Sequence, residues 1–175
     1  TKYVIANPYY IGLYHFQTMF TNDIYFWQAF RNTLILSLIK LFLNTGAAVI
    51  ISLLLNEITN MAFKKSVQTI IYLPHFMSWV VVAAVFKMIL SVNSSGVVNG
   101  ALINMGLIDN PIDFLGSSKY WTGTFFMMNV WKDTGWGTIL FLATLSGISP
   151  DLYEAAQIDG ANRFKRLIYI TLPAL

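Results

Sequence analysis

Three long apolar runs constrain the fold of this chain more than any other feature of its sequence. They cover residues 33–55, 67–90 and 120–145. Each run exceeds the stretch of about 20 mostly apolar residues that a helix needs to cross a lipid bilayer. The first two carry one lysine each, Lys40 and Lys87, and the third holds the adjacent pair Lys132 and Asp133. The runs therefore predict an all-α membrane protein with three complete spans in this sequence.

The composition favours a membrane protein over the alternative, in which the runs are buried helices of a large soluble protein. Hydrophobic residues make up 56% of the chain and charged residues only 11%, whereas soluble domains carry about 25% charged residues. The basic residues are scattered and the net charge is only +3, so no nucleic-acid partner is expected. The absence of cysteine excludes disulfides and thiolate metal sites.

The segments between the runs differ in charge, and this difference predicts their side of the membrane. Basic residues gather in residues 56–66 and 146–173, and cytoplasmic loops are enriched in Lys and Arg. We therefore place these two segments in the cytoplasm and the loops 1–32 and 91–119 outside, and within the latter loop we expect a short helix over Val97–Met105. Because the sequence starts without Met and stops within a pattern, we also expect at least one further span on each side.

The segment after the third run has the signals of a short helix that is closed at both ends. Ser149 is a suitable N-cap, Pro150 suits the first helical position, and Asp151 interacts favourably with the positive end of a helix. Gly160 is a natural C-terminal stop. The sequence therefore predicts a helix of two to three turns between Ser149 and Gly160.

The same segment resembles the EAA loop of ABC importer permeases. The matching positions are Glu154, Ala155, Ala156, Asp159, Gly160, Ile170, Leu172 and Pro173. The resemblance implies that these residues form a coupling loop, which receives the stroke of an ATPase on the cytoplasmic side of the membrane. The structural alternative is an ordinary helix–glycine–helix connector.

Much of the remaining chain is similar to the LplB-type permeases, which are relatives of the maltose permease subunits. The similarity is carried by residues 73–82, 90–91, 96–99 and 131–138. It implies a type I ABC importer transmembrane domain in the cytoplasmic membrane of a bacterium, with an oligosaccharide or polysaccharide fragment as cargo. It also implies a second permease subunit, two ATPase subunits that bind ATP and magnesium, and an external solute-binding protein. No cofactor is then expected in this chain.

Polar residues inside the runs are candidates for the translocation path. In the third run they are Asn129, Lys132, Asp133 and Trp136, which lie three and four residues apart and share one helical face or adjoining faces. Charged groups are costly inside a bilayer, so they are functional candidates, and Trp136 can stack against a sugar ring. The alternative is that these residues bind neighbouring helices together.

Pro74 lies inside the second run, where it predicts a kink or an unwound turn. His75 and Ser78 follow closely, and a kinked helix lined by polar groups suits a gate. The alternative for His75 is a hydrogen-bonded packing residue. Enzyme signatures such as G-x-x-x-x-G-K, H-E-x-x-H and G-x-S-x-G are absent, so no catalytic residue is expected.

Two other function classes remain open at this stage. One is an EAA-type permease for a non-sugar cargo such as an amino acid, a peptide or an osmolyte. The other is a channel or ion-coupled carrier without a motor. The EAA pattern argues against the second, because a channel has no ATPase to contact.

Single cysteines can test the predicted orientation, because the chain has none of its own. Cysteines placed at Ser95 and Asn110 should react with a membrane-impermeant thiol reagent that is added outside. Cysteines at Lys64 and Arg163 should react only after the membrane is broken. The reverse labelling pattern would overturn the orientation derived from the basic loops.

Overall fold

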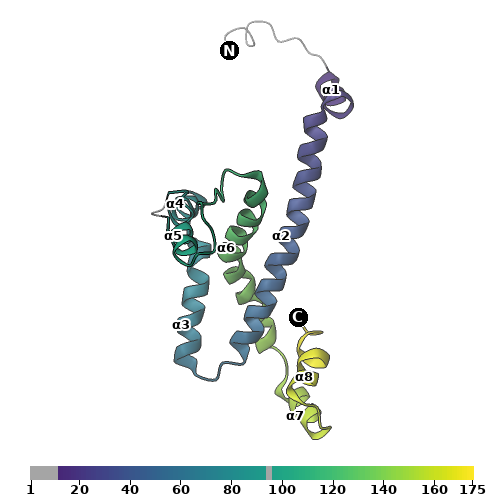
Figure 1. The fold of residues 1–175 in the computed structure, drawn as a ribbon. Coiled ribbons are helices and arrows are strands. Elements are labelled where there is room, and N and C mark those ends of the chain that lie inside the picture. Colours follow the sequence, from purple (N-terminus) through teal and green to yellow (C-terminus); the bar gives the residue numbers. More distant parts are fainter. Residues whose placement is uncertain (1–11, 94–95) are drawn as a thin grey trace. The chain divides into compact units, whose positions relative to one another are not determined.

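The structure is a computed structural model that describes residues 12–93 and 96–175. The first eleven residues of the predicted loop 1–32, and Ser95 within the predicted outer loop, lie outside the described residues. Every regular element of the described chain is helical (Figure 1). The chain divides into two compact units, residues 1–39 and residues 40–175, which are considered separately below.

The first unit contains helix α1, Tyr14–Asn22, and the beginning of helix α2, Ile24–Asn56. The prediction of a loop over 1–32 is therefore wrong for most of its described part. Asp23 explains why the helix starts so early, since its Oδ1 accepts hydrogen bonds from the backbone N–H groups of Tyr25 and Phe26 at 2.9 and 3.2 Å. Capping of this kind satisfies N–H groups that have no partner inside a helix. The apolar run thus marks only part of the helix to which it belongs.

Helix α2 contains the whole of the first predicted span. It is the one helix of the described chain that is, as a single element, long and apolar enough to cross a membrane. Only three of its residues are buried, namely Ala48, Ser52 and Leu55. These residues lie on one side of the helix near its C-terminal end, where it meets the rest of the second unit.

The second predicted span, 67–90, is not a continuous helix. Helix α3, Met61–Tyr72, passes into the 3₁₀ turn η1, Leu73–Phe76, and helix α4, Trp79–Ile89, then leaves at a bend of 106°. The unwound turn expected at Pro74 is confirmed as η1, because proline has no N–H for the helical ladder, and the bend follows at Met77 and Ser78. After the break, Ser78 caps α4 by accepting a hydrogen bond from the N–H of Val81 at 3.3 Å. Together the two arms have the composition of one broken span or of a re-entrant loop.

The predicted short helix of the outer loop is confirmed as α5, Val97–Asn104. Asn99 holds the end of the loop against it. This side chain is fully buried, donates to the carbonyls of Ser91 and Ile112 at 2.8 and 3.0 Å, and accepts from the Ile112 N–H at 2.8 Å. Three hydrogen bonds from one buried amide order a connection that has little other regular structure.

The third predicted span, 120–145, forms the long helix α6, Ser118–Ser146, which packs against α3 and η1 (Figure 1). At about 1.5 Å per residue its length is sufficient to cross a bilayer. However, α6 is not among the helices apolar enough to do so by composition alone. Its buried positions explain the difference, because five of them are polar: Thr124, Asn129, Lys132, Thr134 and Thr138.

Three short helices end the described chain. They are α7, Pro150–Ile158, α8, Arg163–Arg166, and the π-helix η2, Leu167–Thr171. A small apolar core lies where α6 approaches this end, formed by Leu55, Leu142 and Leu145.

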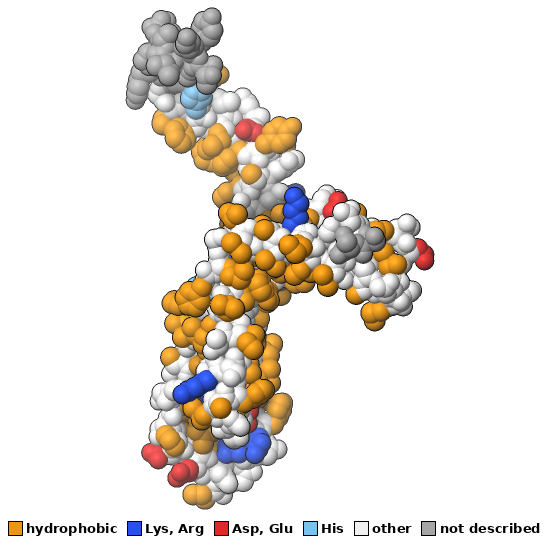
Figure 2. All heavy atoms as spheres, turned by 90° about the vertical axis from the view of Figure 1, so that its left-hand side faces the viewer, with side chains coloured by type: hydrophobic (Ala, Val, Ile, Leu, Met, Phe, Trp, Pro, Cys, Tyr) orange, Lys and Arg blue, Asp and Glu red, His pale blue; other side chains and the backbone are white. Residues whose placement is uncertain are grey.

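Many large hydrophobic side chains remain exposed in both units. They cover much of the face drawn in Figure 2, on which charged side chains are few. Leu54, Val80 and Met88, for example, are 64%, 80% and 75% exposed. Extended apolar surfaces of this kind are typical of contact with lipid or with partner subunits.

Candidate functional site

The centre of the second unit is organised around the broken turn at Pro74. The Lys132 ammonium, on α6, donates a hydrogen bond to the carbonyl oxygen of His75 at 2.9 Å and lies 5.4 Å from the centre of the Trp79 ring. Lys132 is only 6% exposed. A buried ammonium requires hydrogen-bond partners, and a carbonyl in a broken turn requires a donor. Each group therefore satisfies the other.

The neighbouring Asp133 points to a different set of groups. Its Oδ2 lies 3.4 Å from the Lys40 ammonium, on α2, and its Oδ1 lies 3.9 Å from Nδ1 of His75. The side chains of Lys40, His75 and Asp133 are 38%, 31% and 28% exposed. Three separate elements, α2, η1 and α6, thus bring charged or titratable groups to one partly open place.

Trp136 completes this polar cluster, which consists of Lys40, His75, Asp133 and Trp136. The indole ring stacks on the His75 imidazole, with ring centres 5.1 Å apart and planes 15° from parallel. Trp136 is nevertheless 50% exposed. The tryptophan is therefore held in place on one side and accessible elsewhere.

Two glycines on α6 allow the backbones that form the cluster to approach each other. A Cβ atom at Gly135 would lie 2.4 Å from the carbonyl oxygen of Ile71, and one at Gly137 would lie 2.8 Å from Cβ of Ala48. Both distances are too short for real atoms, so larger residues at these positions would force the helices apart. On α2 the close approach lies at Ala48, whereas a Cβ atom at Gly46 would meet no atom within 4 Å.

The predicted path residues fall into two groups in the structure. Asn129 is 2% exposed and donates to the carbonyl of Phe125 on its own helix at 2.8 Å. Like Lys132, it is therefore committed to packing in this chain. Ser78 is exposed but serves as the N-cap of α4. His75, Asp133 and Trp136 lie together and are partly open, and they remain as candidates for contact with a cargo.

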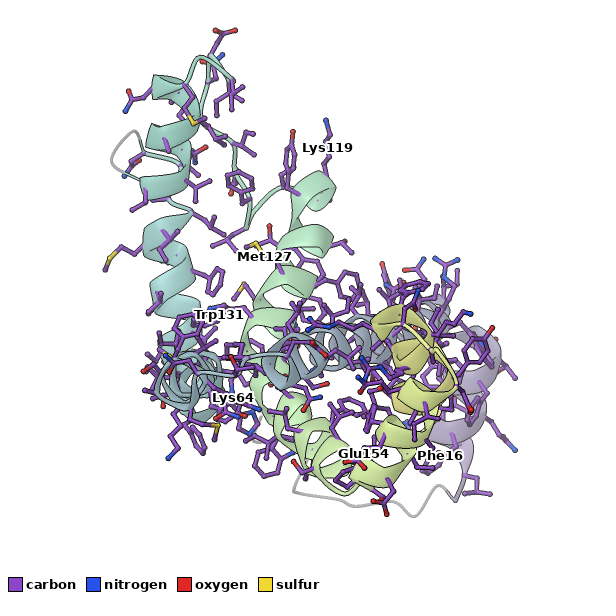
Figure 3. The ribbon with its side chains drawn as sticks, turned by 90° about the horizontal axis from the view of Figure 1, so that it is seen from below. Phe16, Lys64, Lys119, Met127, Trp131 and Glu154 are labelled. Carbon is purple, nitrogen blue, oxygen red and sulfur yellow. The ribbon has the colours of Figure 1, made fainter. Side chains whose placement is uncertain are left out.

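Trp131 shows that the two sides of α6 have different roles. Its side chain extends from α6 toward α4 (Figure 3), where it meets the ring of buried Phe86 at 5.3 Å in an edge-on arrangement. On this side α6 contacts α4 through Trp131, which is itself 41% exposed, whereas Asp133 and Trp136 contact η1 and, through Lys40, α2.

The predicted closure of α7 at both ends is confirmed. The Ser149 hydroxyl accepts from the N–H of Asp151 at 3.3 Å, and Pro150 occupies the first helical position. At the other end Gly160 has φ +73°. The N–H groups of Gly160 and Ala161 donate to the carbonyls of Gln157 and Ala156 at 3.1 and 2.8 Å, which is the hydrogen-bond pattern of a Schellman cap.

The residues of the EAA pattern lie on the outer surface of this unit. Glu154, Ala155, Asp159 and Gly160 are exposed, and Ala156 is half-buried. Figure 3 shows the Glu154 side chain projecting away from the ribbon of α7. These residues are therefore open to a partner. Of the remaining pattern residues, Ile170 is half-buried, whereas Leu172 and Pro173 are exposed beyond the end of η2.

One side-chain contact links α7 to the end of the described chain. The Tyr153 hydroxyl lies 3.1 Å from Oγ1 of Thr171, which is itself 5% exposed and bonded to the carbonyl of Arg166. Beside this contact, a pocket of about 650 Å³ separates the C-terminal end of α2 from the segment between α7 and η2; Leu54, Glu57 and Arg166 are among the residues that line it. Helix α7 is thus tied to η2 but is not packed tightly onto α2.

Residues 44–175 match the family model of the binding-protein-dependent transport system inner membrane component. The chain belongs to this family. Its fold is that of a type I ABC importer transmembrane domain, because it superposes with a TM-score of 0.87 on a chain in the crystal structure of a bacterial ABC transporter that imports the acidic polysaccharide alginate. The two are 38% identical, over 98% of this chain and 58% of the other. The family description places its members in a membrane.

Curated relatives agree with this assignment. Protein LplB of Bacillus subtilis is 41% identical over 94% of this chain and 51% of its own length. The polygalacturonan/rhamnogalacturonan permease YteP of the same organism is 38% identical over 98% of this chain and 52% of its own length, and the lactose permease LacF of Rhizobium radiobacter is 34% identical over 88% and 51%. The chain thus spans about half the length of these relatives.

Sequence reasoning about this permease-family chain missed the partners of its buried charges. Lys40 is the counter-ion of Asp133, and Trp79 lies beneath the ammonium of Lys132. A lone lysine two turns inside an apolar run was the available signal for Lys40, because such a charge needs a partner in a membrane. The sequence alone could not identify Asp133 as this partner, because Asp133 lies on a helix that is distant in sequence.

Replacing Lys132 with methionine should destabilise the chain, because the His75 carbonyl then loses its buried donor. The expected loss is about 1–3 kcal/mol, the cost of leaving one buried polar group unpaired. Thermal unfolding of the purified complex in detergent measures this effect. Lys119→Met is the matched control, since Lys119 is an exposed lysine on the same helix. Equal melting temperatures for the two variants would contradict a structural role for Lys132.

Proposed function

We propose that this chain is a membrane-spanning permease subunit of a bacterial ATP-driven importer, and that its cargo is an oligosaccharide or a polysaccharide fragment. One observation carries the proposal. Helix α7 is capped at both ends and presents Glu154 and Gly160 on its surface, at the positions of the coupling loop. A permease needs such an element because ATP is hydrolysed on another subunit and the motion must be passed to the membrane.

The names of the relatives support a sugar over an amino acid, a peptide or an osmolyte. LacF is named for lactose, YteP for polygalacturonan and rhamnogalacturonan, and the similar solved structure for alginate. A partly exposed tryptophan beside polar groups, as at Trp136, also suits a sugar, because an aromatic face packs against the apolar side of a pyranose ring while polar groups bind its hydroxyls.

The proposed assembly contains a second permease subunit, two ATPase subunits that bind ATP and magnesium, and an external solute-binding protein. A solved structure that is 40% identical to this chain contains an alginate ABC transporter in complex with a periplasmic protein that carries an alginate pentasaccharide. We place the chain in the cytoplasmic membrane as a multi-pass protein, with α2, the bent pair α3–α4 and α6 as its spans. The transport subunit itself performs no catalysis and needs no cofactor of its own.

Coupling in this proposal depends on the stiffness of α7. The ATPase moves the exposed surface around Glu154, and the two caps prevent the helix ends from unwinding under load. The Tyr153–Thr171 contact then carries the motion to η2. Because this contact joins α7 to η2, the two can move as a unit, which is the rigid-body behaviour that alternating access requires.

Gly160→Leu should uncouple ATP hydrolysis from transport while the subunit still inserts in the membrane. Gly160 has a positive φ, and a side chain there costs about 1–2 kcal/mol in backbone strain, which distorts the end of α7. Uptake per ATP hydrolysed in proteoliposomes measures the coupling. Gly106→Leu is a matched control, because Gly106 also has a positive φ (+68°), its Cβ would also meet no atom, and it lies outside the coupling loop.

Native coupling in the Gly160 variant, or an equal loss in both variants, would contradict the role of α7.

Trp136→Ala should slow sugar uptake more than it lowers the yield of the assembled complex. The change removes the accessible ring but leaves the packing side of α6 intact, so the expected effect is about tenfold on uptake, the loss of roughly 1–1.5 kcal/mol of ring contact. The matched control is Trp121→Ala, since Trp121 is a comparably exposed tryptophan near the start of α6. A fully assembled Trp136 variant with unaltered uptake would remove this residue from the path.

A further inference from the structure

The charges inside the predicted spans do not balance. Residues 33–55, 67–90 and 120–145 contain three lysines, Lys40, Lys87 and Lys132, but a single carboxylate, Asp133. Lys87 is exposed close to the end of α4. At the broken turn Lys132 bonds the backbone of His75, and Asp133, which lies beside the His75 ring, is paired with Lys40. Two lysines and one carboxylate thus leave this place with one positive charge in excess.

From this balance we infer that the polar cluster prefers an anionic sugar, a uronate-containing oligosaccharide, to a neutral one, and that Lys40 is the residue that binds the sugar carboxylate. The inference rests on the proposed function and names the chemical class of its cargo. An uncompensated charge in a low-dielectric site favours a ligand of opposite sign far more strongly than the same charge in water.

Of the two lysines at the polar cluster, Lys40 is the one that is accessible to a ligand. Its side chain is 38% exposed, whereas Lys132 is 6% exposed and committed to the His75 carbonyl. An ammonium has three N–H donors, and Asp133 is the ion-pair partner that the structure gives Lys40, at the long distance of 3.4 Å. N–H groups of the Lys40 ammonium therefore remain available to bind a second carboxylate. The buried Lys132 adds a positive charge nearby that does not move.

Asp133 can make room for such a ligand. Its Oδ1 lies 3.9 Å from Nδ1 of His75, and that nitrogen is buried without a hydrogen-bond partner in the described structure. A small shift of the carboxylate toward the imidazole brings the pair to the ~2.9 Å of a hydrogen bond. Asp133 then exchanges part of its contact with Lys40 for one with His75, and the sugar carboxylate takes the place at Lys40.

The ring of the sugar has a place in the same cluster. Trp136 is stacked on one side by the His75 imidazole and is half exposed. A pyranose packs its apolar face on an open aromatic surface, and a uronate carries its carboxylate at the ring edge. Stacking on Trp136 therefore holds the sugar carboxylate beside His75, whose neighbour Asp133 is paired with Lys40.

The experiment compares acid and ester forms of the same sugar. The complete importer, with its partner subunits and binding protein, is reconstituted in proteoliposomes and given trigalacturonate or trimannuronate, each as the free acid and as the methyl ester. The ratio of acid to ester uptake is measured for the wild type and for Lys40→Gln. The same binding protein delivers all sugars to every variant, so a changed ratio between variants belongs to the permease.

Lys40→Gln should lower this ratio by roughly tenfold, which corresponds to the loss of one hydrogen bond to a charged group. Lys87→Gln is the matched control and should leave the ratio unchanged. Asp133→Asn removes the competing carboxylate and should keep or raise the ratio, and Lys40→Arg should preserve it. If Lys40→Gln assembles poorly, Asp133→Asn and Lys40→Arg still test the inference.

An unaltered ratio in Lys40→Gln, or a loss in Asp133→Asn as large as that expected for Lys40→Gln, would overturn the inference and leave the excess charge a purely structural feature. If Lys40→Gln yields no complex, a reduced ratio in Asp133→Asn or Lys40→Arg would overturn it as well. Failure of the proposed function is a separate result: the wild-type complex would then take up none of these sugars, acid or ester, nor a neutral oligosaccharide.

Discussion

The hydrogen bond between the Lys132 ammonium and the His75 carbonyl holds the centre of this molecule together. Pro74 interrupts the helical ladder, and after Phe76 the chain turns through 106°, so backbone groups at this place have no partner within a helix. Non-helical backbone at membrane depth is tolerated only where protein or a cavity satisfies it. Lys132 supplies the donor, and in doing so it fixes the register between α6 and the broken turn. Its neighbour Asp133 and, one turn further on, Trp136 are positioned as a consequence.

This arrangement explains why structural and functional roles are intermixed on α6. Because α6 carries Asn129, Lys132, Thr134 and Thr138 among its buried residues, it is less apolar than α2, the single helix of the described chain whose composition suffices to cross a membrane. Those residues are satisfied by backbone carbonyls of α6 itself or of η1. Asp133 and Trp136 remain partly exposed because their neighbours carry the packing.

The sequence predicted features that depend on local chemistry. The capped helix between Ser149 and Gly160, the break at Pro74 and the short helix after Gly96 each follow from a few adjacent residues, and each is present. The predictions that failed or were missing concern contacts between residues distant in sequence, or the boundaries of helices. The hydrophobic periodicity of the sequence does not predict that Lys40 contacts Asp133 or that Trp136 stacks on His75, because both contacts join elements that are distant in sequence. The N-terminal loop was mistaken because aromatic residues and an Asp23 cap extend α2 beyond its apolar part.

The glycines of α6 have a consequence for the kind of motion this unit permits. At Gly135 and Gly137 the nearest atoms of the neighbouring helices are the Ile71 carbonyl and the Ala48 methyl group. At these two positions a shift of α6 along α3 and α2 requires no change of rotamer, whereas the side-chain contacts of Lys132, Asp133 and Trp136 oppose it. Helix pairs that move in this way undergo shear rather than hinge opening. Sliding by even a fraction of a helical turn would carry Lys132 away from the His75 carbonyl, so this bond, the Asp133–Lys40 ion pair and the Trp136–His75 stack together define the resting position.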